Sequence, residues 1–88
     1  MTQESQLMTE AQIRDNFVVR LRRAMAEADM LNPLQLYNAM VEFDTTMSPS
    51  QAYRWYNGKT LPRLHRMYLL AAVLGIEHWE DLLGSAQP

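Results

Sequence analysis

The stretch "SPSQAYRWYNG" constrains the fold most, because it marks both ends of one short helix. Ser48 can cap the free amides of a first turn, Pro49 suits the first helical position, and Gln51 stands at capping-box distance from Ser48. Asn57 and Gly58 end the helix, since glycine closes a helix in the left-handed conformation without steric cost. The sequence therefore predicts a helix from Pro49 to Asn57, about 13 Å long at 1.5 Å per residue, which is close to the width of a DNA major groove.

Start signals and helical spacing predict four further helices. A capping box opens a helix over 9–29, and an Asn-Pro pair opens a second helix over 33–43. Apolar residues at helical intervals continue over 64–75, where a glycine ends the pattern, and a short last helix follows over 76–83. With short connections, no strand periodicity and no internal repeat, the fold class is predicted to be all-α, with five helices.

A chain of 88 residues suits a single domain. We expect a disordered lead-in over 1–8, a folded domain over 9–84 and a tail over 85–88. No stretch approaches the roughly 18 apolar residues of a membrane span, and the first residues lack the pattern of a secretory signal. The absence of cysteine excludes disulfides and thiolate metal sites. These features favour a cytoplasmic location and no membrane partner.

Charge is distributed unevenly along the chain. The net charge is −2, yet the segment from Thr45 to Ile76 contains four cations and no Asp or Glu, so it carries +4 and the rest carries −6. A local basic patch can engage a polyanion while an acidic remainder limits indiscriminate binding. Charge alone leaves open the alternative interpretation, an ordinary solvated face.

The order of the motifs around "WYNGKTLP" resembles the Cro/CI-type (lambda-repressor-like, XRE) helix-turn-helix family. The family's pattern of a capped recognition helix, a large apolar residue, "NG" and a proline is matched by Ser48, Ala52, Trp55, Asn57, Gly58 and Pro62. "LLAAVLGI" and "EDLLG" stand where the family has its next helix and closing leucines, and "LRRAMAEADMLNPLQL" resembles its first two helices. The resemblance covers about 67 of the 88 residues, from Phe17 to Leu83.

This resemblance implies a compact five-helix lambda-repressor-like domain that binds double-stranded DNA. The base-reading positions that it implies are Pro49, Ser50, Gln51 and Arg54. Gln51 is the leading candidate, since an amide can bond adenine in a bidentate way, and Arg54 can reach a guanine or a phosphate. The positions implied for contacts with the sugar-phosphate backbone or for general attraction to it are Asn57, Lys59, Thr60, Arg63 and Arg66.

Two departures from the family pattern affect the expected geometry. The stretch over 36–48 is about five residues longer than the family's second helix and turn, and Thr46 stands where the turn often has glycine. Tyr56 replaces a glutamate that often pairs with a first-helix arginine. Arg22 or Arg23 must therefore find another partner or remain free for phosphate.

Several apolar residues have a structural interpretation beside the functional one. Ala52, Trp55 and Tyr56 are expected in the core, because their spacing is that of a buried stripe. Tyr53 points away from that stripe, and either DNA or solvent fits it. The apolar residues near the C-terminus could form a subunit contact or belong to the core. They are Ile76, Trp79, Leu82 and Leu83.

The expected function is that of a small DNA-binding transcriptional regulator, a homodimeric repressor that reads an inverted repeat. The alternative is a module of the same shape that binds a protein, as an antiactivator or antitoxin-like partner. An acidic pI, the long turn and a proline at a base-reading position support this alternative. His65 and His78 are the only histidines, and glycine-rich phosphate loops and metal-ligand clusters are lacking, so we expect no enzyme, cofactor or metal.

Overall fold

The computed structural model describes residues 7–83, and within this range all regular secondary structure is helical. Four α-helices and one 3₁₀ helix follow one another as α1 (Glu10–Glu27), α2 (Pro33–Val41), α3 (Pro49–Tyr56), α4 (Leu64–Leu74) and η2 (Trp79–Leu83). The all-α prediction is confirmed, but the expected fifth helix is a five-residue 3₁₀ helix. The predicted lead-in over 1–8 and tail over 85–88 fall mostly or wholly outside the described residues.

The predicted helix starts are confirmed by their capping bonds. The Gln12 N–H donates to Thr9 Oγ1 at 3.1 Å and the Thr9 N–H donates to Gln12 Oε1 at 2.8 Å, which completes a capping box on α1. At the start of α2 the Gln35 N–H donates to Asn32 Oδ1 at 3.0 Å. Each cap satisfies an amide that has no partner within its helix. Ser48 opens α3 in a related way, because its N–H donates to Gln51 Oε1 at 2.9 Å. Three of the four α-helix starts are therefore encoded within a few residues of sequence.

The ends of three helices share one geometry. After α3 the Lys59 N–H donates to the Arg54 carbonyl at 2.9 Å across Gly58, whose φ is 74°. This is the Schellman arrangement, which needs a left-handed residue. Gly75 plays the same part after α4 with φ 75°, and Asp29 does so after α1 with φ 61°. Both glycines were predicted stops, and the turn at Gly58 fixes where the chain leaves α3.

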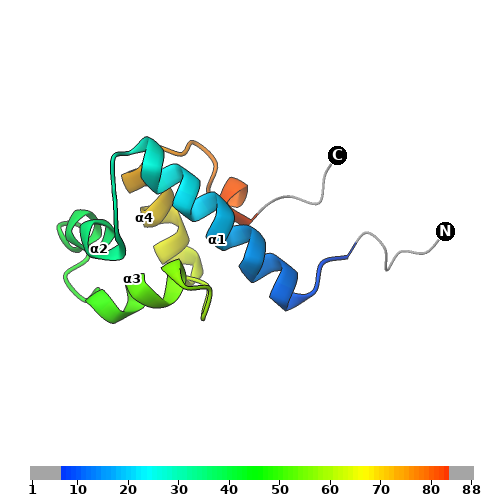
Figure 1. Cartoon of the computed structure of the whole chain (residues 1–88). Helices are drawn as coiled ribbons and strands as arrows, with labels where there is room; N and C mark the ends of the chain where they lie inside the picture. Colours follow the sequence, from blue (N-terminus) through cyan, green and yellow to red (C-terminus); the bar gives the residue numbers. More distant parts are fainter. Residues whose placement is uncertain (1–6, 84–88) are drawn as a thin grey trace.

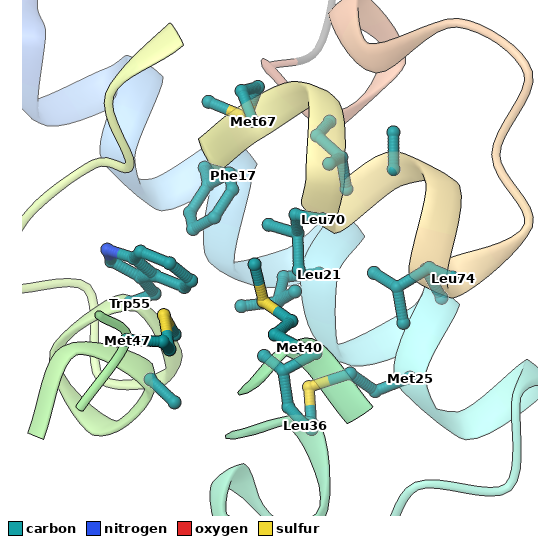
Figure 2. Packing of buried hydrophobic residues seen from close by; sticks show 14 residues of the cluster. Phe17, Leu21, Met25, Leu36, Met40, Met47, Trp55, Met67, Leu70 and Leu74 are labelled. Carbon is teal, nitrogen blue, oxygen red and sulfur yellow. The ribbon is translucent and has the colours of Figure 1, made fainter. Parts of the chain in front are cut away.

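One apolar core joins all five elements, and Figure 2 shows how its side chains converge. The Trp55 indole points from α3 toward Phe17 of α1 and is 3% exposed, and Ala52 is fully buried. Fully burying a large apolar side chain contributes roughly 1.5–3 kcal/mol, so this anchor is substantial. The core role expected for Ala52 and Trp55 is confirmed, and it determines which face of α3 points outward.

In Figure 1, α3 lies at one edge of the helical assembly, with α1 crossing beside it and α2 next to it. α3 contacts both α1 and α2, while η2 contacts α1 and α4. The side of α3 that faces neither α1 nor α2 is open to solvent. Within residues 7–83, no helix has the combination of length and apolar character needed to cross a bilayer.

The residues considered for a subunit contact pack against the core instead. Leu82 is 1% exposed, and Ile76, Trp79 and Leu83 are partly buried against the same cluster. The Trp79 ring also lies 6.5 Å from the ring of Tyr68. For Leu82 the subunit-contact expectation is therefore corrected to the core alternative, because its side chain has no surface left to offer a partner.

We expect Gly58→Ala to lower the free energy of unfolding more than Gly75→Ala does. Both positions have the same left-handed backbone, which costs a residue with a Cβ atom about 1–2 kcal/mol. A Cβ at Gly58 would also meet Val18 Cγ2 at 3.0 Å, whereas a Cβ at Gly75 would meet nothing within 4 Å. Urea unfolding of the two variants isolates the cost of the contact with α1. Equal losses would show that Gly58 is needed only for its backbone conformation.

Candidate nucleic-acid interface

The outer face of α3 is polar and solvent-exposed. It lies opposite the buried side that carries Ala52 and Trp55, and its residues recur at the helical intervals of three, one and three. Its members are Ser50, Tyr53, Arg54 and Asn57. Tyr53, for which the sequence allowed contact with either DNA or solvent, is 43% exposed. A ligand that approaches α3 from outside therefore meets hydroxyl, amide and guanidinium groups together.

The segment that follows α3 extends this face. Lys59, Thr60 and Arg63 are exposed, and a shallow hollow brings Lys59 and Thr60 together with the four side chains of the outer face. A neighbouring hollow contains Arg54 and Thr60 again and continues to Arg63 and His65. We call the continuous area the α3 surface and define it by Ser50, Tyr53, Arg54, Asn57, Lys59, Thr60 and Arg63.

The cations of the α3 surface are not neutralised by neighbours. Within residues 7–83, ion pairs involve Arg14, Arg66 and the two histidines, but none involves Arg54, Lys59 or Arg63. The surface itself contains no carboxylate. Its positive potential is therefore available to an anion, and phosphate groups of a nucleic acid are such anions.

Arg66 has a different environment from the one expected, because its side chain is buried. The residue is 9% exposed, and its Nε donates to Asp44 Oδ2 at 2.7 Å. Its Nη1 donates to Gln51 Oε1 at 2.9 Å and its Nη2 donates to Thr46 Oγ1 at 2.9 Å. The expected phosphate contact of Arg66 is corrected accordingly, since every nitrogen of its guanidinium is occupied inside the protein. We call this set of side chains (Asp44, Thr46, Gln51 and Arg66) the Arg66 network.

Gln51 takes part in this network through its side-chain oxygen. Its Oε1 accepts from the Ser48 N–H at 2.9 Å as well as from Arg66. A bidentate bond to adenine needs both the oxygen and the nitrogen of the amide. The expected adenine contact of Gln51 therefore does not fit this geometry, because its oxygen already has two donors.

The long connection between α2 and α3 owes its shape to the same network. Within it, Asp44 Oδ1 accepts from the Thr46 N–H at 3.0 Å, and Met47 is 4% exposed in the core. Thr46, which stands at a position where the resembled family often has glycine, bridges Asp44 and Arg66 through its hydroxyl. The Asp-x-Thr spacing is a local signal for such a turn, but nothing local to it identifies an arginine 20 residues further along.

Arg22 resolves the second departure from the family pattern. Its Nη2 and Nε donate to the Tyr56 carbonyl at 2.9 and 3.2 Å, and its Cζ lies 4.2 Å from the centre of the Tyr56 ring. A carbonyl at a helix end and an aromatic face both attract a cation. The carbonyl and the ring of Tyr56 thus attract the Arg22 cation in place of a carboxylate. Through these contacts Arg22 connects α1 to the end of α3. Arg23 is exposed.

Two further residues occupy the edges of the α3 surface. Pro49 is exposed at the start of α3, where its ring offers apolar contact and its backbone has no N–H. His65 has a 72% exposed side chain, with Nε2 at 3.8 Å from Asp44 Oδ2. Within residues 7–83, His, Asp and Glu side chains form no group of three that could hold a metal ion.

Comparisons of the chain with protein-family models, with curated proteins and with solved structures find no significant match. The geometry and charge of the α3 surface are therefore the basis for inferring a function.

Stability should fall in acid through Asp44. Hydrogen bonds from the Thr46 hydroxyl and N–H, and then the Arg66 guanidinium, hold the pKa of this carboxyl below its ordinary value of 3.8. A lowered folded-state pKa means that the stabilisation is complete above about pH 4 and is lost as the pH falls through the folded-state value. Asp44→Asn should therefore be less stable than the native chain at pH 7, and this difference should shrink toward pH 2.

Unfolding followed by circular dichroism from pH 7 to pH 2 tests this expectation. Glu42→Gln is the matched control, because Glu42 lies in the same connection, is exposed and makes no side-chain hydrogen bond or ion pair within residues 7–83. A stability difference for Asp44→Asn that is independent of pH would contradict the proposed role of the carboxylate.

Proposed function

We propose that this protein is a sequence-specific DNA-binding transcriptional regulator that places the outer face of α3 in a major groove. The observation that carries the proposal is the α3 surface, where Arg54, Lys59 and Arg63 have no ion-pair partner within residues 7–83 and surround an exposed polar helix face. The eight residues of α3 extend about 12 Å at 1.5 Å per residue, which matches the groove width.

The side chains of the α3 surface would divide between bases and backbone. Arg54 lies in the middle of the face and can bond guanine O6 and N7 in a bidentate way. Ser50 and Tyr53 flank it and can reach base edges or phosphates. Contacts with the sugar-phosphate backbone, which fix the register of α3 without encoding sequence, fall to Asn57, Lys59, Thr60 and Arg63.

In this proposal α2 and α3 are the two helices of a helix-turn-helix. They pack against each other and are joined by residues 42–48, which the Arg66 network holds. The resemblance to the Cro/CI-type family adds the expectation of a repressor in the cytoplasm. Neither a catalytic step nor a cofactor nor a metal is part of the proposed activity.

Dimerisation is part of the proposal, because one short helix reads only a few base pairs. Two copies on an inverted repeat would place their α3 helices in successive major grooves about 34 Å apart. Leu82 is in the core, so the subunit contact must use other apolar side chains. Tyr68 at 65%, Leu64 at 62% and Phe43 at 72% exposure are available for it.

A second function, binding to a protein, is favoured by a separate observation. A mostly apolar hollow beside α2 and α4 is lined by Ala39, Glu42, Phe43, Leu69, Ala72 and Val73. Exposed apolar side chains gathered in one place often mark protein contacts. Binding that depends on this hollow would change little with salt, whereas binding that neutralises phosphates weakens steeply.

Lys59→Ala should weaken binding to every duplex and lower the salt dependence. Each phosphate contact contributes about 0.9 to the slope of log K against log salt, so we expect the slope to fall by about 1. Fluorescence anisotropy between 50 and 200 mM salt measures both quantities. Arg20→Ala is the matched control, since Arg20 is an exposed cation on α1 outside the α3 surface. Equal effects of the two variants, or native binding that is insensitive to salt, would contradict the proposal.

Arg54→Ala should relax base preference at one position of the site, at a cost of about 1–3 kcal/mol in binding. Selection of randomised duplexes by the native and variant chains identifies the position. Arg54→Lys keeps the charge but loses the bidentate fork, so it should recover general affinity without recovering the guanine preference. Full recovery of that preference by lysine would show that Arg54 contacts only phosphate.

A further inference from the structure

The orientation of the Gln51 side-chain amide is determined by its neighbours. The two groups that face it most closely are the Ser48 N–H and Arg66 Nη1, each 2.9 Å from the same amide atom. Both groups are donors that cannot accept a hydrogen bond. The amide atom between them must therefore be the oxygen, and the opposite orientation would bring three donors together.

The nitrogen of the same amide is not engaged inside the protein. Gln51 Nε2 has no hydrogen-bond partner within residues 7–83, where no partly or fully buried residue has an enclosed side-chain nitrogen or oxygen that lacks a partner. Nε2 is therefore accessible to solvent. Gln51 and Arg54 line the same hollow, which links the Gln51 side chain to the central cation of the α3 surface.

Arg66 cannot easily release the oxygen. Its guanidinium is buried and is held by Asp44 at 2.7 Å, by Thr46 at 2.9 Å and by the Met47 sulfur at 3.4 Å. Moving it away from Gln51 would break bonds with groups on the α2–α3 connection, and leaving a buried charge without partners is costly. The Gln51 oxygen is thus retained by a residue that the rest of the fold keeps in place.

We propose that Gln51 reads DNA as a hydrogen-bond donor only, and that Arg66, together with the Ser48 N–H, imposes this restriction as a positioning residue without touching DNA. This inference rests on the proposed function. In the major groove guanine offers two acceptors, thymine offers O4, adenine offers N7 beside a donor, and cytosine offers a donor. A donor-only Gln51 favours guanine, tolerates thymine and disfavours cytosine, and it cannot form the bidentate contact with adenine.

The test begins by finding the base position that Gln51 controls. Randomised duplexes are selected by the native chain and by Gln51→Ala, and the position whose preference disappears in the variant is assigned to Gln51. At that position the native chain should bind guanine about tenfold more tightly than cytosine, with no preference for adenine over thymine. Replacing the guanine by 7-deazaguanine removes one acceptor and should lower the affinity severalfold.

Two variants separate the roles of the two residues. Gln51→Glu keeps an oxygen for Ser48 and Arg66 but presents no donor, so its guanine preference should disappear while the fold is retained. Arg66→Lys removes the fork that holds the oxygen, and adenine should rise severalfold at the Gln51 position. Arg63→Lys is the matched control, because Arg63 is exposed on the α3 surface and should leave that position unchanged. Circular dichroism establishes that each variant is folded.

The outcomes distinguish this inference from the function on which it rests. Failure to bind any duplex would overturn the proposed function. Sequence-specific binding with an adenine preference at the Gln51 position, or with no position that depends on Gln51, would overturn the donor-only inference alone. If Arg66→Lys does not fold, the base profile of the native chain and its response to 7-deazaguanine still decide whether Gln51 acts as a donor.

Discussion

The buried guanidinium of Arg66 is the interaction on which the arrangement of α3 depends. It comes from α4, and it holds Asp44 and Thr46 of the preceding connection together with Gln51 of the first turn of α3. A buried charge is tolerated only when its partners satisfy it, so these segments have little freedom to move apart. The longer connection before α3 is thereby given a defined conformation.

The two ends of α3 are held by arginines from different helices. Arg66 acts at the first turn, and Arg22 of α1 donates to the Tyr56 carbonyl at the last turn. Between these ends, Trp55 anchors the inner face in the core. The outer face takes no part in these contacts, so its side chains are available for a ligand while the helix that carries them is fixed on three sides.

Sequence reasoning succeeded where the determinants are local. The caps at Thr9 and Asn32 and the stop at Gly58 each depend on residues a few positions apart, and the structure has the corresponding helix ends. It failed for Arg66, which looks like one more surface cation when only its neighbours are considered. Its partner Asp44 is 22 residues away, and only the packing of α4 against the α2 region brings the two together.

The same limit explains the outcome for the candidate site. Helical spacing correctly separated the outer face from the buried side, because Ala52 and Trp55 form a regular stripe. It could not reveal that the Gln51 oxygen is engaged by Arg66, since this donor lies 15 residues away. Leu82 shows a related limit, because a short apolar pattern at the end of a chain suits a core and an interface equally well.

The Arg66 network also sets the size of the piece that could be transplanted into another protein. A graft of residues 49–57 alone would carry the exposed side chains of α3. It would leave out Asp44, Thr46 and Arg66, and therefore the constraint on the Gln51 amide. The shortest segment that carries the whole Arg66 network runs from Asp44 to Arg66, so the loop, the helix and the start of the next helix would have to be moved as one unit to keep Gln51 constrained.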